Sequence, residues 1–294
     1  MKKLSVIIDT DIGSDIDDTW ALSAMLADDF FDIRLVTTVW EDVQYKCALV
    51  KKLAACAGKE FPVAAGVATP VQCSAQKAWL EGDIPAFRTD FEDLFFRAAE
   101  GEEEITVAAL GPMTNLARVL EKYPQLAPKL NVVAMIGAIR KGYINQSAPG
   151  AECNAALDPE AFGKVLRSGA RVTIVPLDVC RDFIVDGESF RAVIGSNSPL
   201  ARAVAENYRI WHRNYVGGAI KYPAESSSGI LYDMMVVFYL RFPELFRSET
   251  LPVAATDDGR TVVSAGGTPA RCLLEYEGRE KLTAYLVNGL SQRR

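Results

Sequence analysis

The chain has 294 residues, of which 49% are hydrophobic and 24% are charged. This composition is typical of a soluble globular protein and excludes a disordered, collagenous or coiled-coil chain. The 38 acidic and 32 basic residues give a net charge of −6, and no dense Lys/Arg tract is present, so we expect no nucleic-acid partner. No apolar run reaches the roughly 18 residues that a membrane span requires.

The N-terminal apolar stretch stops at Asp9, too short for the apolar core of an export signal, which has about 7–15 residues. The six cysteines are scattered, without a CxxC pair. We therefore expect free thiols and a cytoplasmic protein. The cysteines are Cys47, Cys56, Cys73, Cys153, Cys180 and Cys272.

The first half of the chain alternates short β-branched runs with helical patterns. The predicted strands are residues 4–8, 33–39, 105–110, 132–136 and 172–176. The predicted helices are residues 18–27, 43–57, 113–122 and 159–167. This alternation predicts an α/β fold, with a mainly parallel central sheet and helices on both of its faces.

The pattern changes after about residue 196. The sequence predicts a long helix over residues 199–215, a Gly/Ser-rich segment over 216–229, an apolar stretch over 230–242, a strand over 271–277 and a closing helix over 279–290. No internal repeat, low-complexity tract or linker is present. We therefore expect one domain over residues 1–294, with its active site outside the carboxyl ends of the strands.

Five carboxylates between positions 9 and 18 follow the first predicted strand and lead into a helix. Helix capping and the helix dipole account for one or two of them, but five at one strand end repel strongly unless a cation neutralises them. Oxygen ligands suit a hard divalent ion, whereas one histidine and no cysteine cluster argue against zinc or copper. The spacing does not fit an EF-hand, and no phosphate-binding glycine motif is present. The residues thus predict a calcium or magnesium site.

Five segments, in chain order, resemble the inosine–uridine-preferring nucleoside hydrolase family. They are Asp-Thr-Asp-x-Gly at 9–13 with Asp-Asp-x-x-Ala-Leu at 17–22, Thr-Thr-Val at 37–39, Leu-Gly-Pro-Met-Thr-Asn-Leu-Ala at 110–117, Ala-Glu-Cys-Asn with Asp-Pro-Glu-Ala at 151–161, and Leu-Tyr-Asp at 231–233. The resemblance covers nearly the whole chain. It implies a single α/β domain, with a mainly parallel sheet, that hydrolyses the N-glycosidic bond of a ribonucleoside to ribose and free base.

The resemblance also implies a metal site. Asp11, Asp18 and Asp233 would bind calcium (Ca²⁺) through their carboxylates, and Leu110 through its backbone carbonyl. The metal would hold the ribose 2′- and 3′-hydroxyls and one water, and Asp11 would take the proton of that water. Members of the family are usually dimers or tetramers, so a homodimer or homotetramer with a role in base salvage is expected.

The chemistry of the reaction fits these residues. Cleavage of a ribosyl C–N bond builds positive charge on the sugar, which a carboxylate-rich pocket stabilises. On the family pattern, Asp17, Glu152 and Asn154 would bind sugar hydroxyls. Two alternatives remain open: Asn154 as a helix cap, and Glu152 as a solvated loop charge. We interpret two further aspartates at predicted strand ends, Asp9 and Asp178, as structural or supporting residues.

The sequence departs from the family pattern in several places. Ser14 and Asp15 lengthen the first acidic loop by two residues. The family's Gly-Asn after the second strand is Glu41-Asp42, where Asp42 can still accept a hydrogen bond from a hydroxyl. The polar residue that precedes the Ala-Glu-x-Asn segment aligns with Gln146, or with Asn145 after a shift of one position.

The largest departure is Tyr232, which stands where related enzymes carry a histidine thought to protonate the leaving base. With a pKa of about 10, a tyrosine is a poor proton donor near pH 7, but its ring can stack on a base, and Trp79 is the candidate for the opposite side. We interpret His212 as a surface residue, with a contact to the base as the alternative. The other aromatic candidates for the base pocket, or for helix packing, are Trp211, Tyr215 and Tyr222.

Two rival functions remain at this point. A calcium-dependent protein that binds a nucleoside or ribose without turnover would fit the changes at Tyr232 and Asp42. A haloacid-dehalogenase-like phosphatase would fit Asp9-Thr10-Asp11, but its motif does not account for Gly13 or for the paired aspartates at 17 and 18. The sequence does not identify the base.

Overall fold

The computed structural model describes residues 3–71, 75–214 and 226–292. Its strands are β1 (Leu4–Thr10), β2 (Phe31–Thr38), β3 (Val63–Ala65), β4 (Ile105–Ala109), β5 (Leu130–Met135), β6 (Arg171–Val175), β7 (Ile184–Asp186), β8 (Ser227–Ile230), β9 (Phe246–Ala255), β10 (Thr261–Val263) and β11 (Thr268–Tyr276). Its α-helices are α1 (Asp17–Ala27), α2 (Val43–Cys56), α3 (Phe91–Ala99), α4 (Thr114–Lys122), α5 (Cys153–Leu157), α6 (Pro159–Arg167), α7 (Leu177–Cys180), α8 (Gly187–Ile194), α9 (Pro199–Asn214), α10 (Met234–Arg241) and α11 (Arg279–Ser291).

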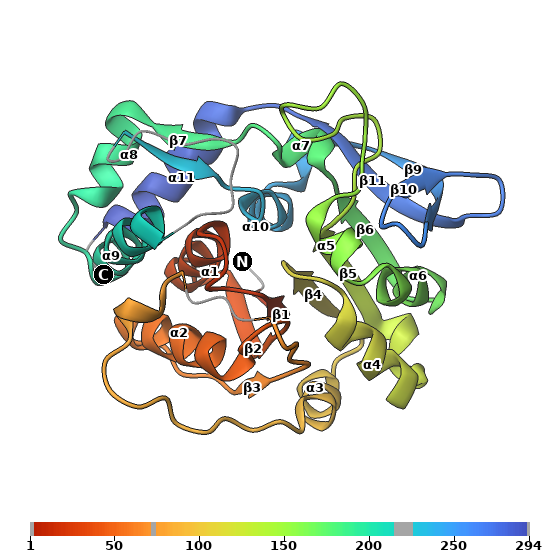
Figure 1. The fold of residues 1–294 in the computed structure, drawn as a ribbon, viewed down its shortest axis with the longest axis horizontal. Helices are drawn as coiled ribbons and strands as arrows, with labels where there is room; N and C mark the ends of the chain where they lie inside the picture. Colours follow the sequence, from red (N-terminus) through yellow and green to blue (C-terminus); the bar gives the residue numbers. More distant parts are fainter. Residues whose placement is uncertain (1–2, 72–74, 215–225, 293–294) are drawn as a thin grey trace.

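A nine-stranded sheet in the order β10-β9-β11-β6-β5-β4-β1-β2-β3 runs through the molecule, and β7 and β8 form a separate small sheet (Figure 1). The strands from β3 to β6 pair in parallel, and β11 is parallel to β6. Within the described ranges, the antiparallel pairs of the large sheet are β9 with β11 and β9 with β10. The predicted α/β fold with a mainly parallel sheet is confirmed.

Helices cover both faces of the sheet because successive strand residues point to opposite sides. In β1, Val6 and Ile8 pack into one buried cluster together with α1, α2, α9, α10 and α11. Ile7 packs into the other cluster, which contains residues of α3, α4 and α6. Strands buried on both faces are expected for parallel sheets with crossover helices.

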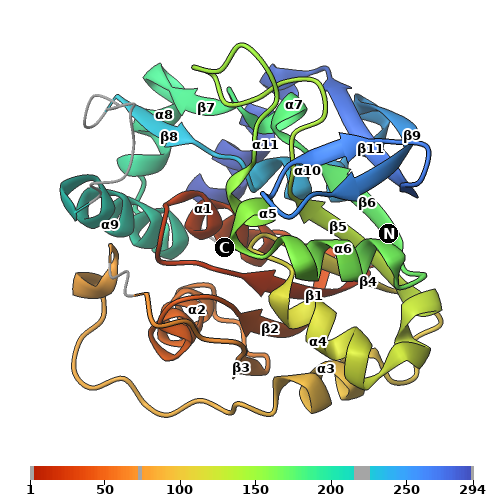
Figure 2. The same cartoon turned by 45° about the vertical axis from the view of Figure 1, so that its right-hand side comes forward.

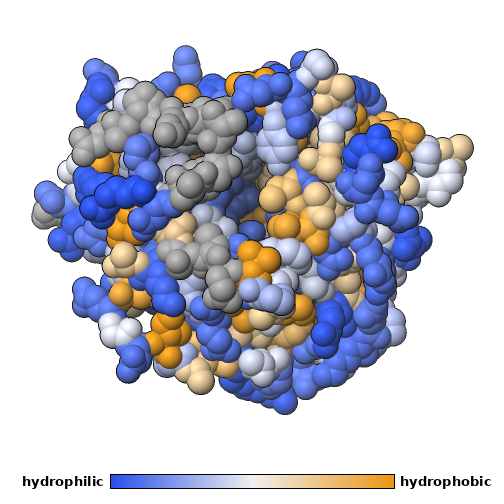
Figure 3. Space-filling view, in the orientation of Figure 1, coloured by the Kyte–Doolittle hydropathy of each residue, from blue (hydrophilic) through white to orange (hydrophobic). Residues whose placement is uncertain are grey.

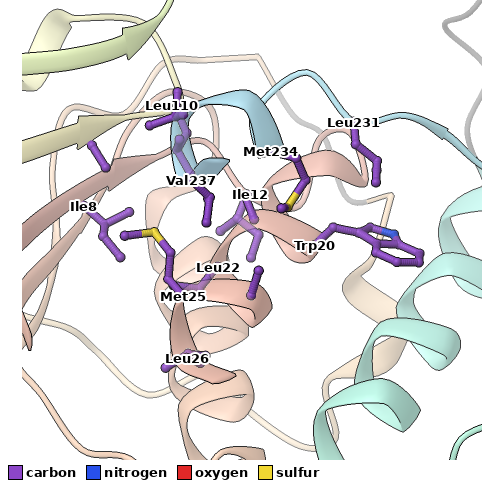
Figure 4. Packing of buried hydrophobic residues seen from close by; sticks show 14 of the residues in the cluster. Ile8, Ile12, Trp20, Leu22, Met25, Leu26, Leu110, Leu231, Met234 and Val237 are labelled. Atoms are coloured by element: carbon purple, nitrogen blue, oxygen red, sulfur yellow. The ribbon is translucent and has the colours of Figure 1, made fainter. Parts of the chain in front are cut away.

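Helix α1 lies between the sheet and a second layer of helices, and all of its residues are buried. Figure 4 shows Leu22 and Met25 of α1 near Val237 of α10, with Ile8 of β1 on the side of the sheet. Ile12, in the loop that leads into α1, belongs to the same cluster. The first turn of α1 therefore has a fixed position at the carboxyl end of β1.

The predicted elements of the first half match β1, β2, β4, β5 and β6 and helices α1, α2, α4 and α6, with ends that differ by at most two residues. Helices α3, α7 and α8 and the pair β9–β10 were not predicted. Most of β9 is exposed or partly exposed, so its residues lack the apolar run on which strand prediction depends. Most of the Gly/Ser-rich segment 216–229 lies outside the described residues, and its end forms β8.

Two further findings concern the sequence predictions. Within residues 3–71, 75–214 and 226–292, no helix combines the length and the apolar character needed to cross a membrane. The cysteines in these ranges, which exclude Cys73, are free thiols as expected.

Candidate active site

The acidic residues lie at the carboxyl edge of the parallel strands. Asp9 is the last residue but one of β1, Asp17 and Asp18 begin α1, and Asp233 immediately precedes α10. Figures 1 and 2 show these segments, with α5, converging on this edge near the middle of the molecule. The space-filling view has a hollow near the centre of the same face (Figure 3). The predicted position outside the strand ends agrees with this arrangement.

Three buried aspartates form a group that can hold a cation. Asp17, Asp18 and Asp233 each offer a carboxylate oxygen, and these atoms lie within 4.8 Å of one another. Burial raises the pKa of Asp18 to about 6, although the Thr10 hydroxyl donates a hydrogen bond to it. Burial and the neighbouring carboxylates raise the pKa of Asp17 and of Asp233 well above the usual range. A divalent cation would relieve this accumulated negative charge.

Asp11 lies beside this group without belonging to it. Burial and the charge of Asp18 raise the pKa of Asp11 to about 7. Its carboxylate lies against Gly111, where an added Cβ would come within 3.0 Å of Asp11 Oδ1 and 2.9 Å of Val39 Cγ1. Because residue 111 is a glycine, the segment that follows β4 can approach Asp11 closely.

Asn154 holds the backbone carbonyl of Leu110 in place. Its side-chain nitrogen donates to Leu110 O at 2.8 Å and to Met135 O at 2.9 Å, and so joins the ends of β4 and β5. Both amide protons are thus used inside the protein. The side-chain oxygen of Asn154, which can only accept, is the atom that the amide can offer to a sugar hydroxyl.

Glu152, rather than Asn154, caps helix α5. Its carboxylate accepts hydrogen bonds from the backbone N–H groups of Gly137 at 2.8 Å, Asn154 at 2.8 Å and Ala155 at 3.1 Å. Glu152 is only 1% exposed, and burial raises its pKa to about 7. The two alternatives raised from the sequence, a capping Asn154 and a solvated Glu152, are therefore wrong.

Two further aspartates hold the backbone, as expected. Asp9 Oδ1 accepts hydrogen bonds from Thr37 Oγ1 at 2.5 Å and Asn115 Nδ2 at 2.7 Å, which ties β1 to β2 and α4. Asp178 in α7 accepts hydrogen bonds from the backbone N–H groups of Ile139 and Arg140, both at 2.9 Å. It fixes the start of the loop that leads to Glu152.

Asp42 serves as a helix cap in the structure. Its carboxylate accepts a hydrogen bond from the backbone N–H of Tyr45 at 3.1 Å and so begins α2. Asp immediately before a helix is a preferred cap, which explains the placement. The residue of this segment that turns toward the acidic loop is Glu41, whose side chain contacts Ser14 and Lys46.

The aromatic candidates fall into two groups. Tyr232 packs edge-to-face on Tyr143, with ring centroids 6.1 Å apart, and the Tyr143 hydroxyl accepts a hydrogen bond from the N–H of Cys153, next to Glu152. Trp79 is only 5% exposed. Its indole N–H donates to Glu206 of α9 at 2.9 Å, and the Lys52 ammonium lies over its ring. Trp79 therefore packs between α2 and α9.

The remaining candidates are less closely tied to the acidic group. Trp211 and His212 pack with Tyr208 on α9, and His212 is partly buried. Gln146 folds back on its own turn, where its oxygen accepts a hydrogen bond from Tyr143 N at 3.3 Å, and Asn145 is exposed. Tyr215 and Tyr222 lie outside the described residues.

Sequence reasoning missed Lys46, which is fully buried beneath the acidic loop. Its ammonium donates to the backbone carbonyl of Asp11 at 2.5 Å and to Ser14 Oγ at 2.7 Å. The signal was its position on α2 between the buried residues Val43 and Val50, three and four residues away on the apolar side of the helix. A lysine on that face is expected to be buried and therefore to be paired with a polar or acidic group.

Comparisons with solved structures show the fold. The structure resembles that of a plant nucleoside hydrolase, the PpNRh1 enzyme, with a TM-score of 0.82 and 22% identity over 98% of this chain and 99% of that one. It also resembles the purine-preferring ribonucleoside hydrolase from Gardnerella vaginalis, with a TM-score of 0.78 and 20% identity over 98% and 99% of the two chains. The chain therefore has the fold of these nucleoside hydrolases.

The sequence comparisons are more specific. The chain is 28% identical to the non-specific ribonucleoside hydrolase RihC of Salmonella paratyphi B, over 94% of this chain and 89% of that protein. The model of the inosine-uridine preferring nucleoside hydrolase family matches residues 6–287. The chain belongs to this family of enzymes, which hydrolyse N-glycosyl bonds. The resemblance found in the sequence is confirmed, and the phosphatase alternative is wrong.

Proposed function

We propose that this protein is a calcium-dependent ribonucleoside hydrolase that cleaves the N-glycosidic bond to give ribose and a free base. The observation that carries the proposal is the buried group of Asp17, Asp18 and Asp233 beside Asp11, at the strand edge of a nucleoside hydrolase fold. Related proteins named as ribonucleoside hydrolases support the substrate class.

The donor set fits calcium. Asp11, Asp18 and Asp233 would supply carboxylate oxygens, and Leu110 would supply its carbonyl, which Asn154 already orients. Calcium prefers six to eight oxygen ligands in a flexible arrangement. Burial raises the pKa of Asp18 and of Asp233, so a positive partner would stabilise their charged forms. When bound, calcium would hold the ribose hydroxyls and make a water easier to deprotonate.

The protein's own residues would then divide the remaining work. Asp11 would bind the cation beside the attacking water and would take the proton of that water, which the cation makes easier to deprotonate. Asp17 and Glu152 would accept hydrogen bonds from sugar hydroxyls, and Asn154 would offer its side-chain oxygen. The carboxylates of Asp17 and Glu152 would stabilise the positive sugar of the transition state.

Recognition of the base would fall to Tyr232 and Tyr143. Their edge-to-face pair would place an aromatic surface beside Glu152, and stacking on a base is tolerant of its identity. We keep Asp42 and Trp79 as weaker candidates for substrate contact, because Asp42 caps α2 and Trp79 is buried against α9. We further propose that residues 1–294 act as one unit and assemble as a homodimer or homotetramer.

One second function has a specific observation in its favour. Tyr232 stands in place of the family's histidine, which removes the usual proton donor to the leaving base. A protein that binds nucleosides in the presence of calcium without turning them over would fit this change.

Release of ribose from inosine, uridine and p-nitrophenyl riboside, each with and without a calcium chelator, tests the proposal. Nitrophenolate leaves without a proton, so this substrate reports on water activation apart from the leaving-group acid. We expect cleavage of the nitrophenyl riboside that chelation abolishes and added calcium restores. Binding of all three compounds without release of ribose would favour the second function.

A further inference from the structure

The loop between β1 and α1 is held by three fully buried side chains, none of which is given a step in the proposed reaction. They bind the carbonyls of alternate loop residues. The three hydrogen bonds are Lys46 Nζ to Asp11 O at 2.5 Å, Tyr45 Oη to Gly13 O at 3.3 Å, and Gln76 Nε2 to Asp15 O at 2.7 Å. Tyr45, Lys46 and Gln76 are each 0% exposed. The acidic loop thus packs on a buried surface formed by these three side chains.

Lys46 is the charged member of this surface. Besides Asp11 O, its ammonium contacts Ser14 Oγ at 2.7 Å and Glu41 Oε2 at 3.1 Å. The Ser14 hydroxyl in turn donates to Glu41 Oε2 at 2.6 Å, so the three side chains form a closed ring of contacts. Burial of an ammonium is strongly unfavourable unless it is paired and hydrogen-bonded, and this ring provides both.

Two departures from the family pattern meet in this ring. Ser14 belongs to the two-residue lengthening of the acidic loop. Glu41 stands where the family pattern has glycine, and its backbone keeps a left-handed conformation with φ of 54°, next to Trp40 with φ of 67°. Side chains other than glycine rarely adopt this conformation. Hydrogen bonds of the Glu41 backbone with Thr69 hold it there, together with the side-chain contacts of Glu41 to Lys46 and Ser14.

We infer that Lys46 is a positioning residue for the hydrolytic site: its ammonium fixes the main chain of Asp11, with Glu41 as its counter-ion and Ser14 as the link to the loop. The inference rests on the proposed function. The Asp11 carboxylate is packed against Gly111, so a shift of its main chain changes where that carboxylate lies. The proposed sugar contacts Glu152 and Asn154 belong to α5 and its cap and have no bond to this ring.

Two variants separate positioning from simple folding support. Lys46→Met leaves the Glu41 carboxylate buried without its cation, so it lowers stability as well as activity. The double variant Lys46→Met with Glu41→Gln removes both charges, and its melting temperature is expected to return toward that of wild type. Because Asp11 O then keeps only the Ser14 hydroxyl, 3.2 Å away, as its side-chain donor, kcat for p-nitrophenyl riboside is expected to stay about 100-fold low, with KM within about threefold of wild type.

Lys51→Met is the matched control. Lys51 lies on the same helix, and its ammonium donates to a backbone carbonyl, that of Phe61, at 3.3 Å, away from the acidic loop. We expect this variant to keep the wild-type kcat and KM.

Two measurements do not depend on turnover. In the calcium-free protein, hydrogen exchange of peptides that cover residues 10–18 is expected to be at least tenfold faster in the double variant than in wild type or Lys51→Met. Calcium titration alone gives the second. If Lys46 only offset negative charge, Lys46→Met, which retains Glu41, would bind calcium more tightly than wild type. If Lys46 positions the loop, the same variant binds calcium more weakly.

The inference is overturned if the folded double variant keeps wild-type kcat and wild-type exchange, or if Lys46→Met binds calcium more tightly. If wild type does not cleave the riboside, the proposed function fails. The exchange and calcium results then still decide whether Lys46 fixes the loop.

Discussion

The two walls of the candidate site are built differently. On one side, three fully buried side chains bind backbone carbonyls of the acidic loop, residues 11–16. They are Tyr45 and Lys46 of α2, and Gln76. On the other side, residues 144–149 are exposed and turn back on themselves, with Ile144 46% exposed. Asp178 anchors that second loop at its start, and the Tyr143 hydroxyl anchors it near its end.

This difference separates two tasks. The wall that carries Asp11 tolerates little movement, because proton transfer requires atoms within about 2.6–3.2 Å of each other. In the proposed function, the wall next to Tyr143 and Tyr232 would contact the base, which is the variable part of the substrate, and an exposed loop can change there at small cost. Substitutions on the first wall should therefore change the rate, and those on the second should change the choice of base.

The largest effect is expected on the acidic wall. Asp11→Asn keeps the shape of the side chain but removes the base and one charged calcium ligand, so even at saturating calcium kcat should fall about 10³-fold. Steady-state kinetics with p-nitrophenyl riboside measure this. Asp29→Asn, at a mostly exposed carboxylate paired with Lys59, is the control. An Asp11→Asn enzyme with more than a tenth of the wild-type kcat would show that another group takes the proton.

A smaller loss is expected when the same wall is displaced rather than chemically changed. Gly111→Ala places a Cβ 3.0 Å from Asp11 Oδ1 and 2.9 Å from Val39, and should lower kcat about 10–100-fold. Gly266→Ala, where a Cβ meets nothing within 4 Å, should leave kinetics unchanged. Equal kinetics for the two variants would mean that Asp11 can move without loss.

At the boundary of the two walls, Glu152→Gln should reduce stability. One amide nitrogen would replace an oxygen that accepts a backbone N–H, at a cost of about 1–3 kcal/mol. The pKa of Glu152 is raised from 4.5 to about 7, so its contribution to stability is present below pH 4.5 and is lost as the pH rises through 7. Urea unfolding from pH 4.5 to 7.5 should show a shallower decline for the variant than for wild type. A parallel decline would contradict the burial of Glu152.

The smallest effects are expected for the aromatic residues of the second wall and its surroundings. Tyr232→Ala should raise KM for inosine about tenfold through loss of stacking. Trp79→Phe should stay within about twofold of wild type in both kinetic constants while lowering stability by about 1 kcal/mol, since it loses only the bond to Glu206. A rise in KM for Trp79→Phe as large as that for Tyr232→Ala would return Trp79 to the base pocket.

The sequence predicted the parallel part of the fold because buried strands have continuous apolar runs. Helix α6 was predicted from end to end, since Asp158 caps it and Pro159 begins it. Strand β9 was missed because its side chains are largely solvated. Its place in the sheet depends on its pairing with β11, and the local sequence of β9 does not indicate that pairing.

The site divides in the same way. The aspartates at 9–18 are adjacent in sequence, so their repulsion could be inferred directly. Asp42 was interpreted as a substrate ligand although its position before α2 also fits a cap. Lys46 was missed because its partners, Ser14 and Glu41, lie 32 and 5 residues away, and only the folded chain places the acidic loop over α2.

The ring of Lys46, Ser14 and Glu41 also determines where this chain can be recombined with a relative. A crossover between residues 14 and 41 would take the acidic loop from one parent and positions 41 and 46 from the other. Such a chimera would carry a buried cation without its hydroxyl partner, or a lengthened loop without its cation. Productive chimeras should therefore inherit residues 11–46 from a single parent.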